Sequence, residues 1–186
     1  MSVTIAVANA KGGCGKTTSA LHLSVALADV GYNTLAIDID AQHTLSRHLG
    51  VVPRGIPTMR NVLFDGASVQ DVAVEVRPNL RVVPASLTLA NADVSLSQLA
   101  GSDLRLRRAM TSPDWDICII DCPPSLGKLC MNALVAATHF LVPIDSSAPY
   151  ALEVPAALCG SSCGSSPTPA PPAAAPQVPV PPPSPP

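Results

Sequence analysis

The chain has 186 residues, a formal net charge of −2 and only 13% charged residues. This length suits one domain, and the near-neutral charge excludes the strongly basic field with which many proteins attract nucleic acid. Prolines number 21, most of them near the C-terminus, which is too many for one compact domain. We therefore expect a folded part, residues 1–158, followed by a separate tail, residues 159–186.

Targeting and cysteine patterns are those of a cytoplasmic protein. No basic segment followed by a long apolar run opens the chain, so we expect no signal peptide. The longest apolar stretch, 133–144, is too short to span a bilayer. The six cysteines form no CxxC pair, which disfavours a zinc site. We interpret them as reduced thiols, with disulfides as the alternative, and we expect no membrane partner.

Short apolar runs alternate with helical patterns through the folded part. The run 3–8 predicts a buried strand, and the next pattern predicts a helix from Lys16 to about Val30, with Gly31 as its C-terminal cap. Further strands are predicted at 34–37, 80–83, 117–120 and 140–142. Because such strands alternate with helices, we expect an α/β fold with a doubly wound, mostly parallel sheet and helices on both faces.

The tail, 159–186, consists almost entirely of Cys, Gly, Ser, Pro and Ala and has no charged residue. Such a composition buries too little apolar surface to offset the entropy lost on ordering, so we expect disorder. Its prolines favour the polyproline II conformation. A docking segment for an SH3- or WW-like domain is therefore the alternative interpretation.

A glycine-rich segment, residues 10–18, joins the first predicted strand to the first predicted helix. Phosphate binding needs glycines, a lysine, a hydroxyl beside that lysine for Mg²⁺ and a helix N-terminus. The sequence AKGGCGKTT meets all four requirements and predicts a P-loop. Ala10 stands where the usual motif has glycine, and Lys11 is a second lysine at the loop entrance. The alternative is a glycine-rich turn with two solvated lysines.

Carboxylates end two of the predicted strands. Asp38 and Asp40 end one strand two residues apart, on the same side, and Asp121 ends another. Ligands of open α/β sheets gather at the carboxyl ends of strands, so all three are expected near the phosphates. Either Asp38 or Asp40 would hold Mg²⁺ through water while the other orients the attacking water. The alternative is that both cap the next helix or turn.

Together these segments resemble the ParA/Soj family of partitioning ATPases, and more broadly the MinD-like ATPases with a deviant Walker A motif. The matching stretches are KGGCGKTT (11–18), AIDIDAQ (36–42), NLRVVPASLTLANAD (79–93), DCPPSL (121–126), NALVAAT (132–138) and ALE (151–153). The resemblance implies binding and hydrolysis of ATP with Mg²⁺, in an ATP-sandwich homodimer. It also implies a role in chromosome or plasmid partitioning with a ParB-like DNA-binding partner.

The resemblance further implies a role for each matching residue of the loop. Lys11 resembles the signature lysine that reaches the partner's phosphates across the dimer, and Gly12 lies at that dimer contact. Lys16 would hold the β- and γ-phosphates, Thr17 the Mg²⁺ and Thr18 the α-phosphate.

The aspartates receive roles in the same way. Asp40 resembles the residue that positions the hydrolytic water, and Asp121 resembles the Walker B aspartate. The expected catalytic residues are Lys11, Lys16 and Asp40. The expected nucleotide-binding residues are Lys11, Gly12, Gly13, Cys14, Gly15, Lys16, Thr17 and Thr18. The expected metal ligands are Thr17, Asp38 and Asp121.

The sequence departs from the family pattern at Ala41, where relatives have proline, at Val154, where they have glycine, and in the C-terminal region. Relatives continue with segments that complete the sheet and the adenine pocket and carry basic DNA-binding surface. We therefore expect a truncated or frameshifted chain whose sheet is incomplete on its C-terminal side. Non-specific DNA binding, and with it association with the nucleoid, would then be weakened.

Two alternative functions follow from this departure. One is a non-catalytic fragment that binds nucleotide weakly or titrates a full-length partner. The other is an adaptor that acts through its proline-rich tail. Arg105, Arg107 and Arg108 form a small basic cluster on a predicted helix, interpreted as a solvated face rather than a DNA contact.

Overall fold

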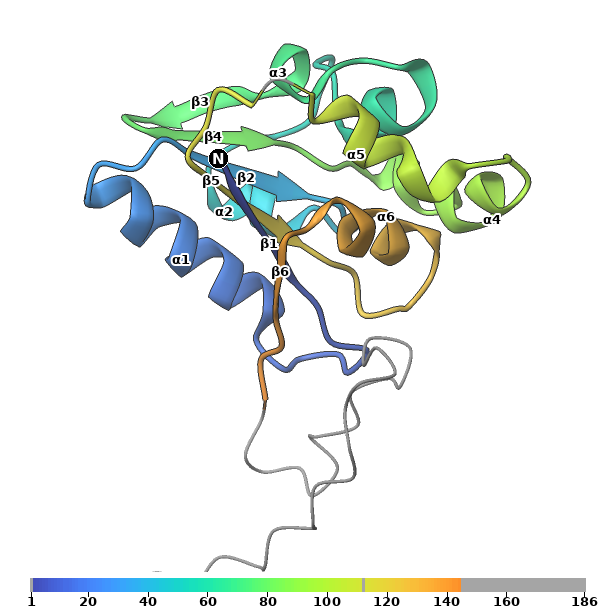
Figure 1. The fold of residues 1–186 in the computed structure, drawn as a ribbon, viewed down its shortest axis with the longest axis horizontal. Helices are drawn as coiled ribbons and strands as arrows, with labels where there is room; N and C mark the ends of the chain where they lie inside the picture. The colour runs from blue at the N-terminus through green and yellow to red at the C-terminus, as the bar shows by residue number, and fades with distance from the viewer. Residues whose placement is uncertain (1, 112, 145–186) are drawn as a thin grey trace, which may run out of the picture. The chain divides into compact units, whose positions relative to one another are not determined.

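The computed structural model describes residues 2–111 and 113–144 (Figure 1). The chain divides into two units, Met1–Ala151 and Leu152–Pro186. The second unit lies outside the described residues, and so do the ALE stretch, the expected boundary at 158 and the predicted tail. Those expectations stay predictions.

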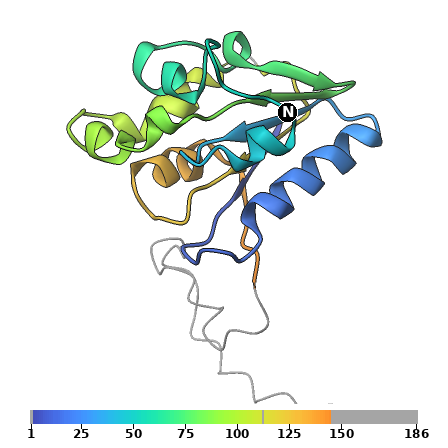
Figure 2. The ribbon, with the colours of Figure 1, turned by 180° about the vertical axis from the view of Figure 1, so that it is seen from behind.

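The described part contains six strands and six α-helices, seen from both sides in Figures 1 and 2. The strands are β1 (Val3–Val7), β2 (Thr34–Asp38), β3 (Val74–Arg77), β4 (Leu80–Val83), β5 (Ile117–Asp121) and β6 (His139–Leu141). The α-helices are α1 (Lys16–Asp29), α2 (Thr44–His48), α3 (Val69–Val72), α4 (Ala92–Ser97), α5 (Arg105–Ala109) and α6 (Lys128–Ala136). Shorter turns of other helix types lie at Asn61–Asp65, Leu87–Leu89 and Ser102–Leu104.

The strands form one sheet in the order β3-β4-β2-β5-β1-β6. All neighbouring strands run parallel except β3 and β4, which are antiparallel. The predicted mostly parallel α/β sheet is therefore confirmed, and all five predicted strands are present within one or two residues of their expected bounds. β3 was not predicted from the sequence; it is a half-buried edge strand joined to β4 by a tight turn with Asn79 at φ 61°.

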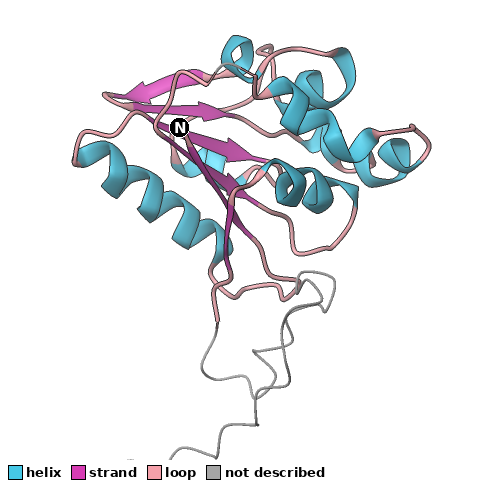
Figure 3. Ribbon diagram, in the orientation of Figure 1, coloured by secondary structure: helices cyan, strands magenta, loops and turns pink. Residues whose placement is uncertain are grey.

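Helices cover both faces of this sheet, as Figure 3 shows. On one face, Ala20 and Ala28 of α1 and Leu45 of α2 pack with Ala36 and Ile119 of the central strands in one buried cluster. Helices α4 and α5 both pack against α6, and α5 and α6 lie in front of the sheet in Figure 1, where α2 lies behind it. The P-loop helix and the helix after β5 thus flank the carboxyl ends of the same strands.

Helix α1 follows its predicted course and ends just before Gly31, whose φ of 98° suits glycine and confirms the predicted C-terminal cap. Its buried residues beyond the first turn are small ones, Ala20, Ser24 and Ala28. Larger residues such as Leu21 and Val25 lie beside this small-residue face and are only partly buried. The small face lets α1 approach the sheet closely, which fixes the position of the loop that precedes it.

The predicted basic cluster lies on α5, but only part of it is solvated. Arg105 donates a hydrogen bond of 2.7 Å to the carbonyl oxygen of Leu63, whereas Arg107 and Arg108 are exposed.

Four cysteines lie in the described residues, namely Cys14, Cys118, Cys122 and Cys130, and all are buried and free of disulfides. In residues 2–111 and 113–144, no helix is long and apolar enough to cross a bilayer.

The start of α6 is held by residues from three neighbouring segments. Asp93 of α4 accepts a 2.8 Å hydrogen bond from the backbone N–H of Leu129, and Lys128 pairs with Asp103 at 3.0 Å. Fully buried Asn132 accepts a 3.1 Å hydrogen bond from the N–H of Leu106. These contacts fix the helix that follows the Asp121 loop.

We expect Gly127→Ala to lower the free energy of unfolding by about 1–3 kcal/mol, because overpacking of a tight site has that cost. A methyl group on Gly127 would overlap the Asp93 carboxylate, which is already held by the N–H of Leu129. Urea denaturation measures the loss. In an Asp93→Ala background the same change should cost clearly less, and an equal cost in both backgrounds would contradict the proposed clash.

Candidate functional site

The predicted P-loop lies between β1 and α1, at the carboxyl end of the sheet. The chain leaves β1 after Val7 and enters α1 at Lys16. Gly13 and Gly15 have φ values of 73° and 87°, a left-handed conformation that side chains larger than glycine rarely adopt. The glycines therefore let the loop turn sharply and bring backbone N–H groups to the start of a 14-residue helix, where negative charge is favoured.

Lys16 is buried, with 7% of its surface exposed, and its ammonium group lies inside the loop. Its Nζ donates a 2.9 Å hydrogen bond to the carbonyl oxygen of Lys11. The Sγ of Cys14 donates to the same oxygen at 3.2 Å, so one carbonyl oxygen accepts hydrogen bonds from both side chains. Lys11 itself is exposed at the outer edge of the loop, and its backbone N–H donates to Oδ1 of Asn9 at 2.9 Å. The two lysines of the motif thus lie in different environments.

The carboxyl ends of β1, β2 and β5 meet beside this loop. Asp38 of β2 and Asp121 of β5 are register partners, and Val7 of β1 is the partner of Asp121 on its other side. Two predicted site residues from separate parts of the sequence are therefore adjacent in space. This juxtaposition follows from the parallel strand order β2-β5-β1.

Asp38 and Asp40 lie in different environments despite their spacing. Asp38 is fully buried and accepts three hydrogen bonds, at 3.1 Å from the N–H of Asp40 and at 2.9 and 2.7 Å from the N–H and hydroxyl of Ser46. Burial raises its pKa, and the hydrogen bonds from Ser46 partly oppose that shift. Asp40 lies beyond the end of β2 and is half-buried, and its Oδ1 accepts a 2.9 Å hydrogen bond from the N–H of Gln42.

The contacts of both carboxylates agree with the capping alternative. Asp38 receives an N–H of the first turn of α2, and Asp40 closes a turn of its own. The hydrogen bond from Gln42 does not prevent Asp40 from also contacting a ligand. Both oxygens of Asp38, in contrast, already accept hydrogen bonds.

Asp121 is the carboxylate best suited to a metal ion. It is 1% exposed, and neither of its oxygens accepts a well-formed hydrogen bond from the described residues. Burial raises its pKa to about 7, while the side chain of Thr17 and the charge of Lys16 act in the opposite direction. A buried carboxylate without a well-formed hydrogen bond is costly, and a divalent cation would supply the missing positive charge. Thr17 offers a hydroxyl oxygen beside it, so the two residues fit Mg²⁺.

A pocket of about 250 Å³ joins the P-loop to the two strand-end loops. It is lined by Gly12, Gly13, Gly15, Lys16, Thr17, Thr18, Asp40 and Pro124. Seven of these eight residues were predicted as site residues, and Pro124 was missed, although it belongs to the DCPPSL stretch after Asp121. Small-molecule sites usually measure about 300–1,000 Å³, so this pocket suits the phosphates of a nucleotide better than a whole nucleotide.

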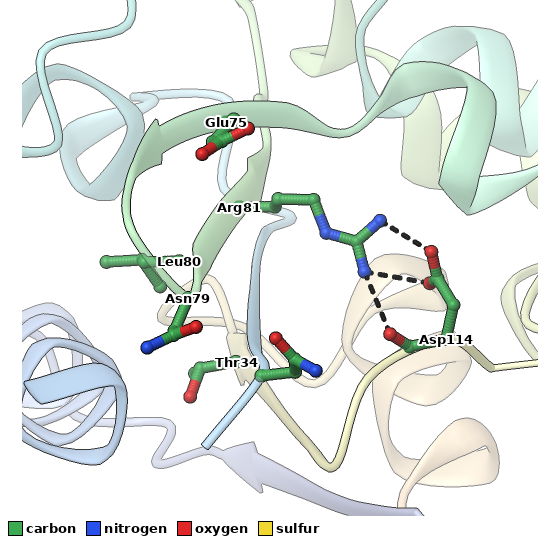
Figure 4. A pocket seen from close by; sticks show the side chains of 7 residues that line it. Thr34, Glu75, Asn79, Leu80, Arg81 and Asp114 are labelled. Carbon is green, nitrogen blue, oxygen red and sulfur yellow. Dashed lines mark hydrogen bonds and ion pairs between the residues drawn. The ribbon is translucent and has the colours of Figure 1, made fainter. Parts of the chain in front are cut away.

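A second pocket, of about 340 Å³, lies at the opposite, amino-terminal end of the strands (Figure 4). Arg81 of β4 points across it to Asp114, and the two side chains form paired hydrogen bonds of 2.8 Å. The bond from Arg81 lowers the pKa of Asp114. Because the guanidinium is already bound to Asp114, this pocket offers no comparable anion site.

Comparison with known proteins agrees with the geometry. A family described as an AAA domain matches residues 2–159. The sporulation initiation inhibitor protein Soj of Bacillus subtilis is 39% identical over 158 residues, which is 82% of this chain and 62% of Soj. The chromosome partitioning protein ParA of Caulobacter vibrioides is 40% identical over 147 residues, 76% of this chain and 55% of ParA. The chain thus spans somewhat more than half the length of these relatives.

A solved structure shares the fold. Cobyrinic acid a,c-diamide synthase from Mycobacterium smegmatis, crystallised with an ATP analogue and magnesium, superposes with a TM-score of 0.73 and 37% identity. The match covers 77% of this chain and 60% of the synthase. The fold, the loop and the sequence relationship lead to one conclusion: this chain belongs to the ParA/Soj family of P-loop partitioning ATPases.

Proposed function

We propose that the chain binds Mg²⁺ and ATP at the P-loop pocket and hydrolyses the ATP as a sandwich homodimer, in partitioning of chromosomal or plasmid DNA with a ParB-like partner. The observation that carries this proposal is Asp121, a buried carboxylate without a well-formed hydrogen bond that lies beside Thr17 at the start of α1. A buried charge of this kind is costly to the fold unless it has a ligand.

The phosphates would be held by the loop and the first turn of α1. Lys16 places its ammonium group inside the loop and would bind the β- and γ-phosphates. The backbone of Gly13, Cys14 and Gly15 would turn its N–H groups toward the same oxygens. Thr18, which lines the pocket and is exposed, would contact the α-phosphate.

Thr17 and Asp121 would hold Mg²⁺, which neutralises charge that develops on the β- and γ-phosphate oxygens during hydrolysis. Asp40 lines the same pocket and is half-buried, and it would orient the attacking water. Phosphoryl transfer asks mainly for such positioning and charge neutralisation.

We expect Lys11→Ala to abolish ATP-dependent dimerisation while leaving ATP affinity within about threefold, because the loss of an exposed charge changes local binding little. Lys11 is exposed at the outer edge of the loop, where a partner's phosphates could be reached, whereas Lys16 lies inside. Sedimentation velocity with a slowly hydrolysed ATP analogue measures dimerisation, and nucleotide titration measures affinity. Lys128→Ala is the matched control, because Lys128 begins α6 and pairs with Asp103 outside the P-loop pocket.

Two outcomes would change the proposal. If Lys11→Ala dimerises as well as the unaltered chain, Lys11 does not act on the partner's phosphates. If the unaltered chain binds ATP but neither dimerises nor hydrolyses it, the alternative applies, namely a fragment that binds nucleotide weakly or titrates a full-length partner. Such a fragment would reduce the ATPase rate of a full-length relative on mixing.

A further inference from the structure

A continuous chain of hydrogen bonds links the end of β4 to the loop that carries Asp40. The N–H of Ala85, just beyond β4, donates to the Oγ of Ser46 at 3.1 Å. The Ser46 hydroxyl in turn donates to Oδ2 of Asp38 at 2.7 Å, and the Ser46 N–H reaches the same oxygen at 2.9 Å. The other oxygen of Asp38 accepts the N–H of Asp40 at 3.1 Å.

The two central members of this chain are inaccessible to solvent. Asp38 and Ser46 are both 0% exposed, and neither lines the P-loop pocket. Hydrogen bonds to a buried carboxylate are stronger than those between neutral groups, and a broken one leaves an unsatisfied buried group behind. The arrangement is therefore rigid, and it fixes backbone rather than offering a free ligand.

The Ser46 hydroxyl has a particular place in the arrangement because it donates and accepts at once. Its proton goes to Asp38, and its oxygen receives the N–H of Ala85. Through this one group, the ends of β2 and β4 and the first turn of α2 are tied together. Asp40, at the pocket rim, is held by the same unit through its own N–H.

We propose that Asp38 and Ser46 are positioning residues for Asp40, which hold the Asp40 backbone at the rim of the phosphate pocket and couple it to the end of β4. The inference rests on the proposed ATPase function for its kinetic consequence but not for its structural one. It gives Asp38 a role different from that of an Mg²⁺ ligand, which was expected from the sequence and stays a prediction; both oxygens of Asp38 accept internal hydrogen bonds.

The kinetic test compares Ser46→Ala with Ser46→Thr, which keeps a hydroxyl. We expect Ser46→Ala to lower kcat about tenfold to a hundredfold, since misplacement of a catalytic group by about 1 Å has that effect, with ATP affinity within about threefold. Ser46→Thr should recover most of the lost kcat. Ser97→Ala, at an exposed position of α4, is the control for the loss of a serine hydroxyl, which there donates to a backbone carbonyl.

A second measurement does not need turnover. Amide hydrogen exchange, followed residue by residue with NMR, should show protected N–H groups at Asp40 and Ala85 that lose protection together in Ser46→Ala. Protection should return in Ser46→Thr. If Ser46→Ala keeps both the kcat and the protection of the Asp40 amide, the inference is overturned.

Asp38→Asn separates the positioning role from the metal role and serves if Ser46→Ala does not fold. If Asp38 is a positioning residue, Asp38→Asn should exchange the Asp40 amide faster and should have a lower kcat, while its Mg²⁺ requirement stays unchanged. A metal ligand predicts instead a large rise in the Mg²⁺ concentration that gives half-maximal rate, which would overturn the inference. If the unaltered chain shows no turnover, the proposed ATPase function fails, whereas the exchange experiment still decides the role of Ser46.

Discussion

Lys16→Ala is expected to abolish ATP binding at micromolar concentrations and to bring turnover to the background rate. Lys16 is 7% exposed and its ammonium group lies within the loop, so the substitution removes a positive charge from the phosphate pocket. Each hydrogen bond to a charged group contributes about 1.5–3 kcal/mol, which is about tenfold to a hundredfold for each bond lost. Loss of two such bonds to phosphate oxygens would lower affinity by about two to four orders of magnitude.

Isothermal titration with an ATP analogue and a phosphate-release assay measure the two effects of Lys16→Ala. Lys128→Ala is again the matched control, because it removes the same side chain from an ion pair outside the pocket. Thermal unfolding should be recorded for both variants, since Lys16 also bonds the carbonyl of Lys11. Equal affinities of a folded Lys16→Ala variant and the unaltered chain would exclude the P-loop as the nucleotide site.

Asp121→Asn is expected to stabilise the chain in the absence of metal and nucleotide, and to do so increasingly as pH rises. Burial raises the pKa of Asp121 from 3.8 to about 7, so the fold favours the protonated form. The stability that the protonated Asp121 side chain contributes is fully present below about pH 4 and is lost as pH rises through 7. At about 1.4 kcal/mol for each pKa unit, the ionised group costs up to about 4 kcal/mol at about pH 8.

Urea denaturation between about pH 4 and pH 8 in a chelating buffer tests this expectation. The unaltered chain should lose stability across that range, and Asp121→Asn should lose much less. Asp114→Asn is the control without a pH dependence of its own in this range. The pKa of Asp114 is lowered from 3.8 by its hydrogen bond from Arg81, so its small contribution is present throughout about pH 4–8 and is lost only on further acidification. A pH dependence that persists unchanged in Asp121→Asn would contradict the raised pKa.

The same substitution should separate stability from function. The neutral amide introduced by Asp121→Asn would lack the charge that Mg²⁺ requires, so the variant should bind nucleotide with little dependence on Mg²⁺ while it unfolds at higher urea concentration. Stability gained by removing a functional charge is a common trade-off at active sites. If Asp121→Asn instead lost both stability and Mg²⁺-dependent nucleotide binding, Asp121 would serve the fold rather than the metal.

The sequence predicted the loop and the strand-end aspartates because both depend on local chemistry and on one topological rule. Gly13 and Gly15 indicate a backbone with positive φ, and parallel strands bring their carboxyl ends to one edge. The prediction extended the two-residue alternation of β2 to Asp40, but β2 ends at Asp38. Beyond that point the spacing no longer tells which way a side chain points.

Other features depend on contacts that no single segment reveals. Short helices such as α2 and α4 have too few residues for a clear period of about 3.6 residues, and β3 is an edge strand of four residues. The role of Ser46 requires knowledge that Asp38 and Ala85 lie on either side of it. A buried hydrogen-bonding serine carries no sequence signature, so only the three-dimensional arrangement identifies it.

The position of β1 between β5 and β6 has a consequence for how the chain is made. β1 leaves the ribosome before every other described strand, yet its neighbours are the last two strands of the described chain. Pairings so distant in sequence form slowly, because a long loop must close before either contact stabilises it. β1 therefore has no partner strand until β5 has been made, and it is paired on both edges only after synthesis has passed residue 141; before β5 is made, this apolar strand is available to chaperones or to aggregation.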